Sequence, residues 1–169
     1  MIKLEKFTTA DFDRMINWII DESFMYQFGG PVFVFPLTHK QLNKYISENN
    51  RQIYKVIETN TDRIIGHGEI NKIDLINKNA RLSRILVAEE TDRNKGYGSL
   101  IIKELLKIGF QDLGLHRIDL GVFEFNKSAI KCYEKCGFKQ EGLLRDSFVI
   151  GQEFHSICNM SILKHEWES

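Results

Sequence analysis

Hydrophobic and polar residues follow two different periods along this chain. In some segments they alternate, which predicts strands with one buried face, and in others apolar residues recur every three or four positions, which predicts amphipathic helices. The periods change in an orderly way, giving a strand, two helices, three strands, a helix, a strand, a helix and two final strands. The predicted order is therefore βααβββαβαββ.

The first third of the chain contains one predicted strand and two predicted helices. Thr8 or Thr9 offers a hydroxyl to cap the first helix, and Thr38 begins the second, which ends near Ser47. The segment between them, residues 24–35, is rich in aromatic side chains but interrupted by glycines and a proline, which predicts a loop against the core. The strand covers residues 2–7, and the apolar positions of the first helix are Phe12, Met15, Ile16, Trp18 and Ile19.

The rest of the chain alternates between strands and helices. Gly114 stops the first of these helices, Asn126 caps the second and Gly137 ends it. A strand, a helix and a second strand joined in this way imply a right-handed parallel crossover. The predicted strands lie near residues 52–57, 63–70, 81–87, 117–123, 138–140 and 154–163, and the predicted helices near 97–111 and 127–135.

Together these elements predict an α+β (α/β) protein with a mixed, mostly antiparallel sheet and helices on both faces. The chain has 169 residues, which is near the usual size of one domain with one core. It shows neither internal repeats nor low-complexity linkers. We therefore expect residues 1–169 to form a single domain.

Charge and cysteine content narrow the range of functions. Lysine plus arginine and aspartate plus glutamate number 23 each, so no overall charge attracts nucleic acid or an anionic membrane. The three cysteines lack the paired short spacings of a zinc site, so no metal is expected, and Cys132 and Cys136 are expected to pack as small apolar residues. The N-terminus lacks the apolar core of a signal peptide and no long apolar run follows, so the expected location is cytoplasmic.

The segment from Arg93 to Ser99 lies between a predicted strand and a predicted helix and can bind phosphate. Gly96 and Gly98 remove Cβ atoms where the backbone must turn and approach a ligand, while the first N–H groups of the helix lack helical acceptors. Those N–H groups and the helix dipole attract an anion. A glycine needed only for the turn is the alternative. The residues predicted to contact the anion are Arg93, Asn94, Lys95, Gly96, Tyr97, Gly98 and Ser99.

Two segments of the chain match a pair of known motifs. The first has the form Arg/Gln-x-x-Gly-x-Gly/Ala and is met by Arg93, Gly96 and Gly98. The second has the form Asn-x-x-Ala-x-x-x-Tyr-x-x-x-Gly-Phe and is met at every named position, by Asn126, Ala129, Tyr133, Gly137 and Phe138. Together they resemble the GNAT superfamily of N-acetyltransferases. Residues 141–145 look like the branch that contains ribosomal-protein N-terminal and spermidine acetyltransferases.

This resemblance implies an enzyme that moves an acetyl group from acetyl-CoA (coenzyme A) to a primary amine. In the superfamily the central parallel strands are splayed, and the pantetheine arm lies along the strand before the phosphate turn. A main-chain amide of that strand binds the acyl carbonyl, and here it belongs to Leu86, Val87 or Ala88. Asn126 is expected to bond the cofactor arm or an ordered water while capping its helix, and Ala129 lies in the same motif.

Acetyl transfer to an amine sets three chemical demands. The amine must lose a proton, the acyl oxygen must be stabilised as it becomes negative, and the departing thiolate benefits from a proton. Tyr133, one helical turn after Ala129, is the expected general acid because it falls at the tyrosine position of the motif. A core tyrosine with an incidental hydrogen bond is the alternative.

The sequence offers no obvious general base. Relatives that this chain resembles often carry a glutamate on the strand before the phosphate turn, but residues 80–85 contain no carboxylate. Glu69, on the neighbouring predicted strand, could act through water, and Ser83 could relay a proton. Glu69 could also simply face solvent. His67 lies on the same face of that strand and is expected to be solvent-facing or hydrogen-bonded.

The acceptor stays open between a polyamine, a peptide N-terminus and an aminosugar. The aromatic segment 24–35, with Phe148 and the last hairpin, is the expected wall of its pocket. We expect direct attack in a ternary complex, because nothing marks a base beside Cys132 or Cys136 that would support an acyl-enzyme. The expected partner is thus a small amine or a peptide, with no nucleic acid or membrane, and the expected assembly is a monomer or homodimer.

Two other classes of function compete with the enzyme. A non-catalytic acyl-CoA-binding regulatory module would keep the fold and lose acetylation, and the missing strand carboxylate makes this conceivable. A purely structural domain with an accidental glycine turn would bind no coenzyme A at all. Release of free thiol from acetyl-CoA in the presence of amines separates the enzyme from both.

Overall fold

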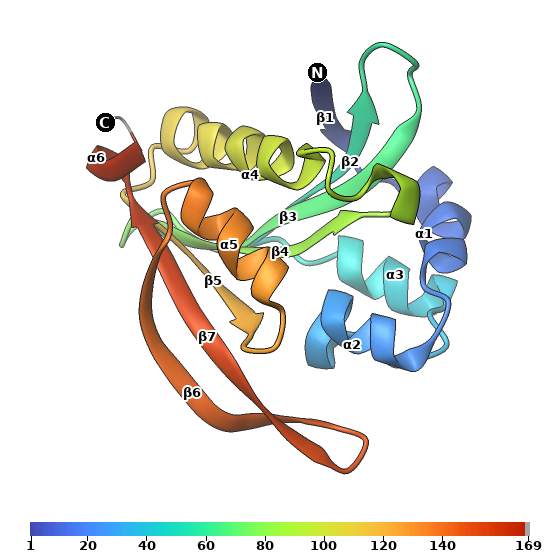
Figure 1. Cartoon of the computed structure of the whole chain (residues 1–169). Coiled ribbons are helices and arrows are strands. Elements are labelled where there is room, and N and C mark those ends of the chain that lie inside the picture. Colours follow the sequence, from blue (N-terminus) through green and yellow to red (C-terminus); the bar gives the residue numbers. More distant parts are fainter. Residues whose placement is uncertain (168–169) are drawn as a thin grey trace.

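The computed structural model describes residues 1–167 and contains a mixed seven-stranded sheet (Figure 1). The strand order is β1-β2-β3-β4-β5-β7-β6, and within residues 1–167 β4 and β5 are the one parallel pair. This arrangement confirms the predicted fold class. The strands are β1 (Ile2–Lys6), β2 (Gln52–Glu58), β3 (Ile64–Asp74), β4 (Asn79–Val87), β5 (Arg117–Phe123), β6 (Lys139–Ile150) and β7 (Glu153–Leu163).

Helices cover both faces of the sheet (Figure 1). One face packs against α1 (Phe12–Trp18), α2 (Glu22–Gly29) and α3 (His39–Ile46). The other packs against α4 (Tyr97–Lys107) and α5 (Lys127–Lys135), and a short α6 (Lys164–Trp167) follows β7. Within the described residues, no helix is both long enough and apolar enough to cross a membrane.

Alternation along the central strands divides the core into two clusters. On β5, Ile118, Leu120 and Val122 are buried against α4 and α5, so the residues between them face the opposite side of the sheet. On that opposite side the first three helices close a second cluster over Ile53 of β2 and Leu86 of β4. Because the central strands β4 and β5 alternate in this way, one side of the sheet packs on α4 and α5 and the other on the first three helices.

The parallel pair is short and then opens. β4 and β5 share three register pairs, which end at Arg81 and Asp119, although both strands continue beyond that point. On its other edge β4 pairs with β3, and there the register shifts between His67 and Glu69. Arg84 lies within this shift with φ +50°, which is a β-bulge that bends the strand. The structure thus confirms the predicted splay.

The predicted loop over residues 24–35 is wrong, because its first half is helical. Asp21 caps α2 by accepting a hydrogen bond from Phe24 N at 2.7 Å, and Met25 and Phe28, three positions apart, are buried on one face. Gly29 is the last residue of the helix, and Gly30 and Pro31 belong to the single 3₁₀ turn that follows, residues 30–32. The glycine-rich end of the segment masked the helical spacing before it.

Two other boundaries differ from the sequence prediction. The strand expected near residues 138–140 is β6, which continues to Ile150, because most of its side chains are exposed and leave no alternating pattern to read. The helix expected to reach residue 111 is α-helical to Lys107 and then forms one π-helical stretch, Ile108–Asp112, before Gly114 turns with φ +64°.

Close approach of β3 and β4 gives a stability prediction. A Cβ added at Gly66 would lie 2.2 Å from the main-chain oxygen of Leu86, so Gly66→Ala must push the strands apart. We expect Gly66→Ala to lower the free energy of unfolding by about 2 kcal/mol in urea denaturation. Gly142→Ala is the matched control, since a Cβ there meets nothing within 4 Å. Equal stability of the two variants would contradict the packing described.

Candidate active site

The turn before α4 presents free main-chain donors. Asn94 and Gly96 have φ of +62° and +85°, and a Cβ at Gly96 would meet no atom within 4 Å, so the turn is open there. The first helical hydrogen bond runs from Leu100 N to Gly96 O at 3.2 Å. The N–H groups of residues 97–99 therefore precede the helical bonds and lie at the positive end of the α4 dipole. This geometry fits a diphosphate.

An acidic side chain beside the turn is neutralised. Asp92 is buried, and its carboxylate pairs with Arg63 at 2.9 Å and with Lys95 at 3.4 Å. The hydrogen bond from the Arg63 guanidinium is the main reason why the pKa of Asp92 lies below its usual value. The turn consequently offers its N–H groups without an unbalanced negative charge.

Three side chains of the predicted anion site hold the turn in place. Arg93 donates to Val87 O at 3.4 Å and to Ala88 O at 3.2 Å, which ties the turn to the end of β4. The Tyr97 hydroxyl donates to Glu58 on β2, and this bond raises the pKa of Tyr97. Both side chains are thus bonded within the fold. The third side chain, Ser99, lies with Oγ 3.2 Å from Sγ of Cys132 on α5.

Only one of the three amides predicted for the acyl carbonyl faces the splay. Ala88 N donates to Ile65 O at 3.0 Å and therefore faces β3. N–H groups alternate between the two edges of a strand, so Leu86 N also faces β3, whereas Val87 N and Ile85 N face the opened side toward β5. The prediction that the amide of Leu86 or Ala88 binds the acyl carbonyl is therefore wrong, because both amides face β3. Ile85 was missed, although strand alternation from Val87 could have found it.

The predicted acid lies on α5, half-buried. Tyr133 packs edge-on against Phe138 with ring centroids 5.8 Å apart, and within residues 1–167 no acceptor is paired with its O–H. Burial raises the pKa of Tyr133, so the phenol keeps its proton at neutral pH. Asn126 caps the same helix by accepting from Ala129 N at 3.2 Å, which confirms its capping role and leaves its amide nitrogen for another contact.

Glu69 is fully buried and its oxygens are occupied. It accepts hydrogen bonds from Arg51 at 3.0 Å, from Arg84 at 2.9 Å and from the Tyr45 hydroxyl. Both carboxylate oxygens of Glu69 are therefore engaged by side chains of the fold, and neither is left free to contact an amine. Ser83 lies directly opposite Glu69 in the β3–β4 register.

Comparisons with known proteins decide the family. Residues 12–138 match the model of the acetyltransferase (GNAT) family. This chain belongs to the GNAT family. It is 31% identical over 142 residues to a spermidine N(1)-acetyltransferase of Vibrio cholerae, covering 84% of this chain and 80% of that protein. It is also 27% identical over 105 residues to a putative ribosomal N-acetyltransferase of Bacillus subtilis, covering 62% and 56% of the two chains.

Solved structures agree with this assignment. The crystal structure of the Vibrio cholerae spermidine N-acetyltransferase in complex with CoA and spermine has a TM-score of 0.86 and 27% identity, covering 99% of this chain and 98% of that one. The GNAT protein described here is accordingly an acetyl-CoA-dependent N-acetyltransferase that transfers the acetyl group to an amine.

An aromatic cluster joins α2 to the last hairpin of this GNAT enzyme. Tyr26 of α2 meets Phe148 of β6 at 6.1 Å, and Phe148 meets Phe123 of β5 at 5.2 Å. Phe125 stacks on Phe123 at 5.0 Å and meets His155 of β7 at 5.2 Å. The structure therefore brings the predicted aromatic segment and Phe148 together, at the end of β5 where the sheet has opened.

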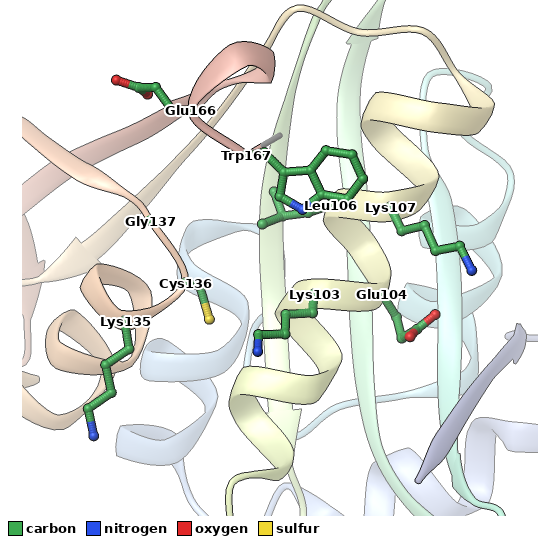
Figure 2. A pocket seen from close by; sticks show the side chains of 9 residues that line it. All are labelled: Lys103, Glu104, Leu106, Lys107, Lys135, Cys136, Gly137, Glu166 and Trp167. Carbon is green, nitrogen blue, oxygen red and sulfur yellow. The ribbon is translucent and has the colours of Figure 1, made fainter. Parts of the chain in front are cut away.

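A separate pocket of about 480 Å³ lies between α4, α5 and α6 (Figure 2). It contains none of the residues predicted for the cofactor or for catalysis. The lining residues are Lys103, Glu104, Leu106, Lys107, Lys135, Cys136, Gly137, Glu166 and Trp167. Most of the residues predicted for the cofactor and for catalysis lie instead on β4, on the turn before α4 and on α5.

The turn generates a binding prediction. Gly98→Asp adds a negative charge in the first turn of α4, where it suits the helix but repels a diphosphate. We expect calorimetry to show at least about tenfold weaker acetyl-CoA binding with an unchanged fold. In Gly98→Ala the new Cβ would lie 3.6 Å from Cys132 Sγ, an ordinary contact, so this control should bind nearly as the wild type does. Equal affinity for Gly98→Asp would remove the turn from the cofactor site.

Proposed function

We propose that this GNAT enzyme acetylates the α-amine at the N-terminus of a peptide or protein, by direct attack in a ternary complex. One observation carries the choice of acceptor, namely that Glu69 is fully buried and already bonded to Arg51 and Arg84. The carboxylate that the sequence offered as a general base is thus engaged within the fold. The amine that accepts the acetyl group must then be able to lose its proton without a strong base from the enzyme.

The pKa of the amine provides that reactivity. An α-amine has a pKa near 8 and an alkylamine near 10.4, so at pH 7.5 about a quarter of the former and about 0.1% of the latter is neutral. An α-amine can therefore attack with a water molecule as proton acceptor, whereas a polyamine needs a stronger base. The aromatic cluster of Tyr26, Phe123 and Phe148 suits the first side chains of a peptide.

Within this proposal the cofactor is held by the main chain. The donors of residues 97–99 hold the diphosphate, and Val87 and Ile85 hold the arm and the acyl oxygen along the edge of β4. When bound, acetyl-CoA supplies the activated acetyl group. Tyr133 donates its proton to the departing sulfur, because burial keeps the phenol protonated.

A second acceptor is spermidine, and the specific support for it is the 31% identity to a spermidine acetyltransferase. For the compartment we keep the cytoplasm, which suits the three free cysteines. For the assembly we keep a monomer or homodimer, although the Vibrio cholerae relative is described as a dodecamer.

Removing the phenol tests the acid. Tyr133→Phe should lower kcat by at least about tenfold, because the thiolate then leaves without a proton, and leave the KM for acetyl-CoA nearly unchanged. Tyr54→Phe is the matched control, since its hydroxyl bonds Gln52 on β2, away from the splay. Unchanged kcat of Tyr133→Phe across the pH range would rule out the acid role.

An acceptor screen tests the substrate class. Thiol release from acetyl-CoA is measured with peptides that start with serine or alanine, with spermidine and with an aminoglycoside. We expect kcat/KM at pH 7.5 to be at least about tenfold higher for the peptides, and to rise with pH around a midpoint near 8 as the α-amine loses its proton. The control peptide has a blocked N-terminus and one lysine. A preference for spermidine would overturn the peptide proposal, and no thiol release with any amine would overturn the acceptor chemistry altogether.

A further inference from the structure

A buried histidine holds the peptide group that precedes Ile85. His67 of β3 is fully buried, and its Nδ1 lies 2.9 Å from the main-chain oxygen of Arg84. A carbonyl only accepts, so Nδ1 carries the proton and donates. In a trans peptide the C=O and the N–H point in opposite directions. With the Arg84 oxygen held toward His67, the N–H of Ile85 is directed to the opposite edge of β4, where the parallel ladder with β5 has ended.

Because of the bulge, the main-chain carbonyl of Arg84 needs a side chain as its hydrogen-bond partner. The register of β3 and β4 shifts beside Arg84, so the extra residue has no regular ladder partner. Its φ of +50° also costs free energy for a residue with a Cβ. His67 therefore satisfies a carbonyl that the sheet leaves unpaired, and it fixes the orientation of that peptide group.

The side chain of the bulge residue is held as firmly as its carbonyl. Arg84 donates to Glu69 at 2.9 Å, and its guanidinium lies 5.3 Å from the Tyr45 ring and 5.8 Å from the Phe33 ring. Glu69 is anchored in turn by Arg51 at 3.0 Å. The aromatic rings that surround the His67 imidazole belong to Phe7, Phe28 and Tyr45. Buried groups thus hold both the main-chain carbonyl and the side chain of Arg84.

We propose that His67 is a positioning residue for acetyl transfer, which holds the Arg84–Ile85 peptide so that the Ile85 N–H is aimed at the acyl oxygen. Glu69 supports the same peptide through the Arg84 side chain. The inference rests on the proposed function, because it assigns part of that site. It gives a role to two buried polar groups that are not themselves placed to touch the amine.

The protonation state of His67 is consistent with this role. Burial lowers its pKa to about 4, so the ring is neutral at pH 7 and has one N–H to donate. The ring is in contact with the Arg84 carbonyl, the Tyr45 hydroxyl at 3.5 Å from Nε2 and the aromatic rings of Phe7 and Phe28, and the Asp11 carboxylate acts on it as a nearby negative charge. The positively charged Arg84 side chain opposes a second proton.

The first experiment needs no cofactor. Imidazole ¹⁵N NMR of the wild-type protein should show His67 as the neutral tautomer protonated at Nδ1. A ring protonated at Nε2 instead would overturn the proposal, because such a ring cannot donate to the Arg84 oxygen. This result stands whether or not any variant folds.

The second experiment follows the carbonyl of ¹³C-labelled acetyl-CoA by infrared difference spectroscopy, without an amine. In His67→Leu the bound carbonyl should shift toward its frequency in solution, and kcat should fall by about tenfold to a hundredfold with the KM for acetyl-CoA within about threefold. His67→Asn, whose amide can donate near the Nδ1 position, should recover part of both. The matched control is His116→Leu, an exposed histidine before β5.

The outcomes separate this inference from the proposed function. Wild-type protein that polarises the carbonyl but acetylates no peptide would overturn the acceptor and leave the role of His67 supported. A folded His67→Leu with wild-type kcat and carbonyl frequency would overturn the role of His67 and leave acetyl transfer intact. If His67→Leu does not fold, the tautomer and the same spectra of His67→Asn decide, since full loss of polarisation there would contradict rescue by a donor.

Discussion

The separation of β4 from β5 is the constraint on which the rest of the molecule depends. The strands share three register pairs and then part, so the N–H groups on the outer edge of β4 lose their ladder partners. Main-chain donors left unpaired in the middle of a sheet are unfavourable unless a ligand or water satisfies them. The turn before α4 follows β4, and α5, which carries Tyr133, follows β5. The unpaired N–H groups along this edge of β4 are therefore available to bind an extended ligand.

The bulge of β4 is held by buried charged groups on β3 and β4. Glu69, Arg84 and Arg51 would be costly in the core singly, and a buried ion network of this kind adds little net stability over apolar packing. Its value is geometric, because it fixes the bulge at Arg84 and hence the direction of one peptide group. In the proposed function Glu69 therefore takes no part in proton transfer, and the amine loses its proton to water.

The sequence was sufficient for most of the fold, because the central strands and helices bury one face each and so carry a clear period. It failed at residues 24–35, where glycines at the end of α2 obscured the helical spacing, and along β6, whose exposed side chains carry no alternation. Within the site, motif spacing located the turn and Tyr133. It could not reveal the direction of the amides at Leu86 and Ala88, or the bond from His67 to the bulge, because both depend on the register of β3 against β4.

In the turn before α4, the side chains hold the backbone in place and the main-chain N–H groups are the donors for an anion. Arg93 is bonded to the carbonyls that end β4, and the carboxylate of Asp92 is shared between Arg63 and Lys95. These contacts fix the φ values of +62° and +85° that turn successive N–H groups outward. An anion bound by main-chain donors is recognised by its shape and charge, whatever the side chains nearby. Such a site depends on the geometry of the turn. The side chains of Arg93 and Asp92 affect the ligand indirectly, by holding that geometry.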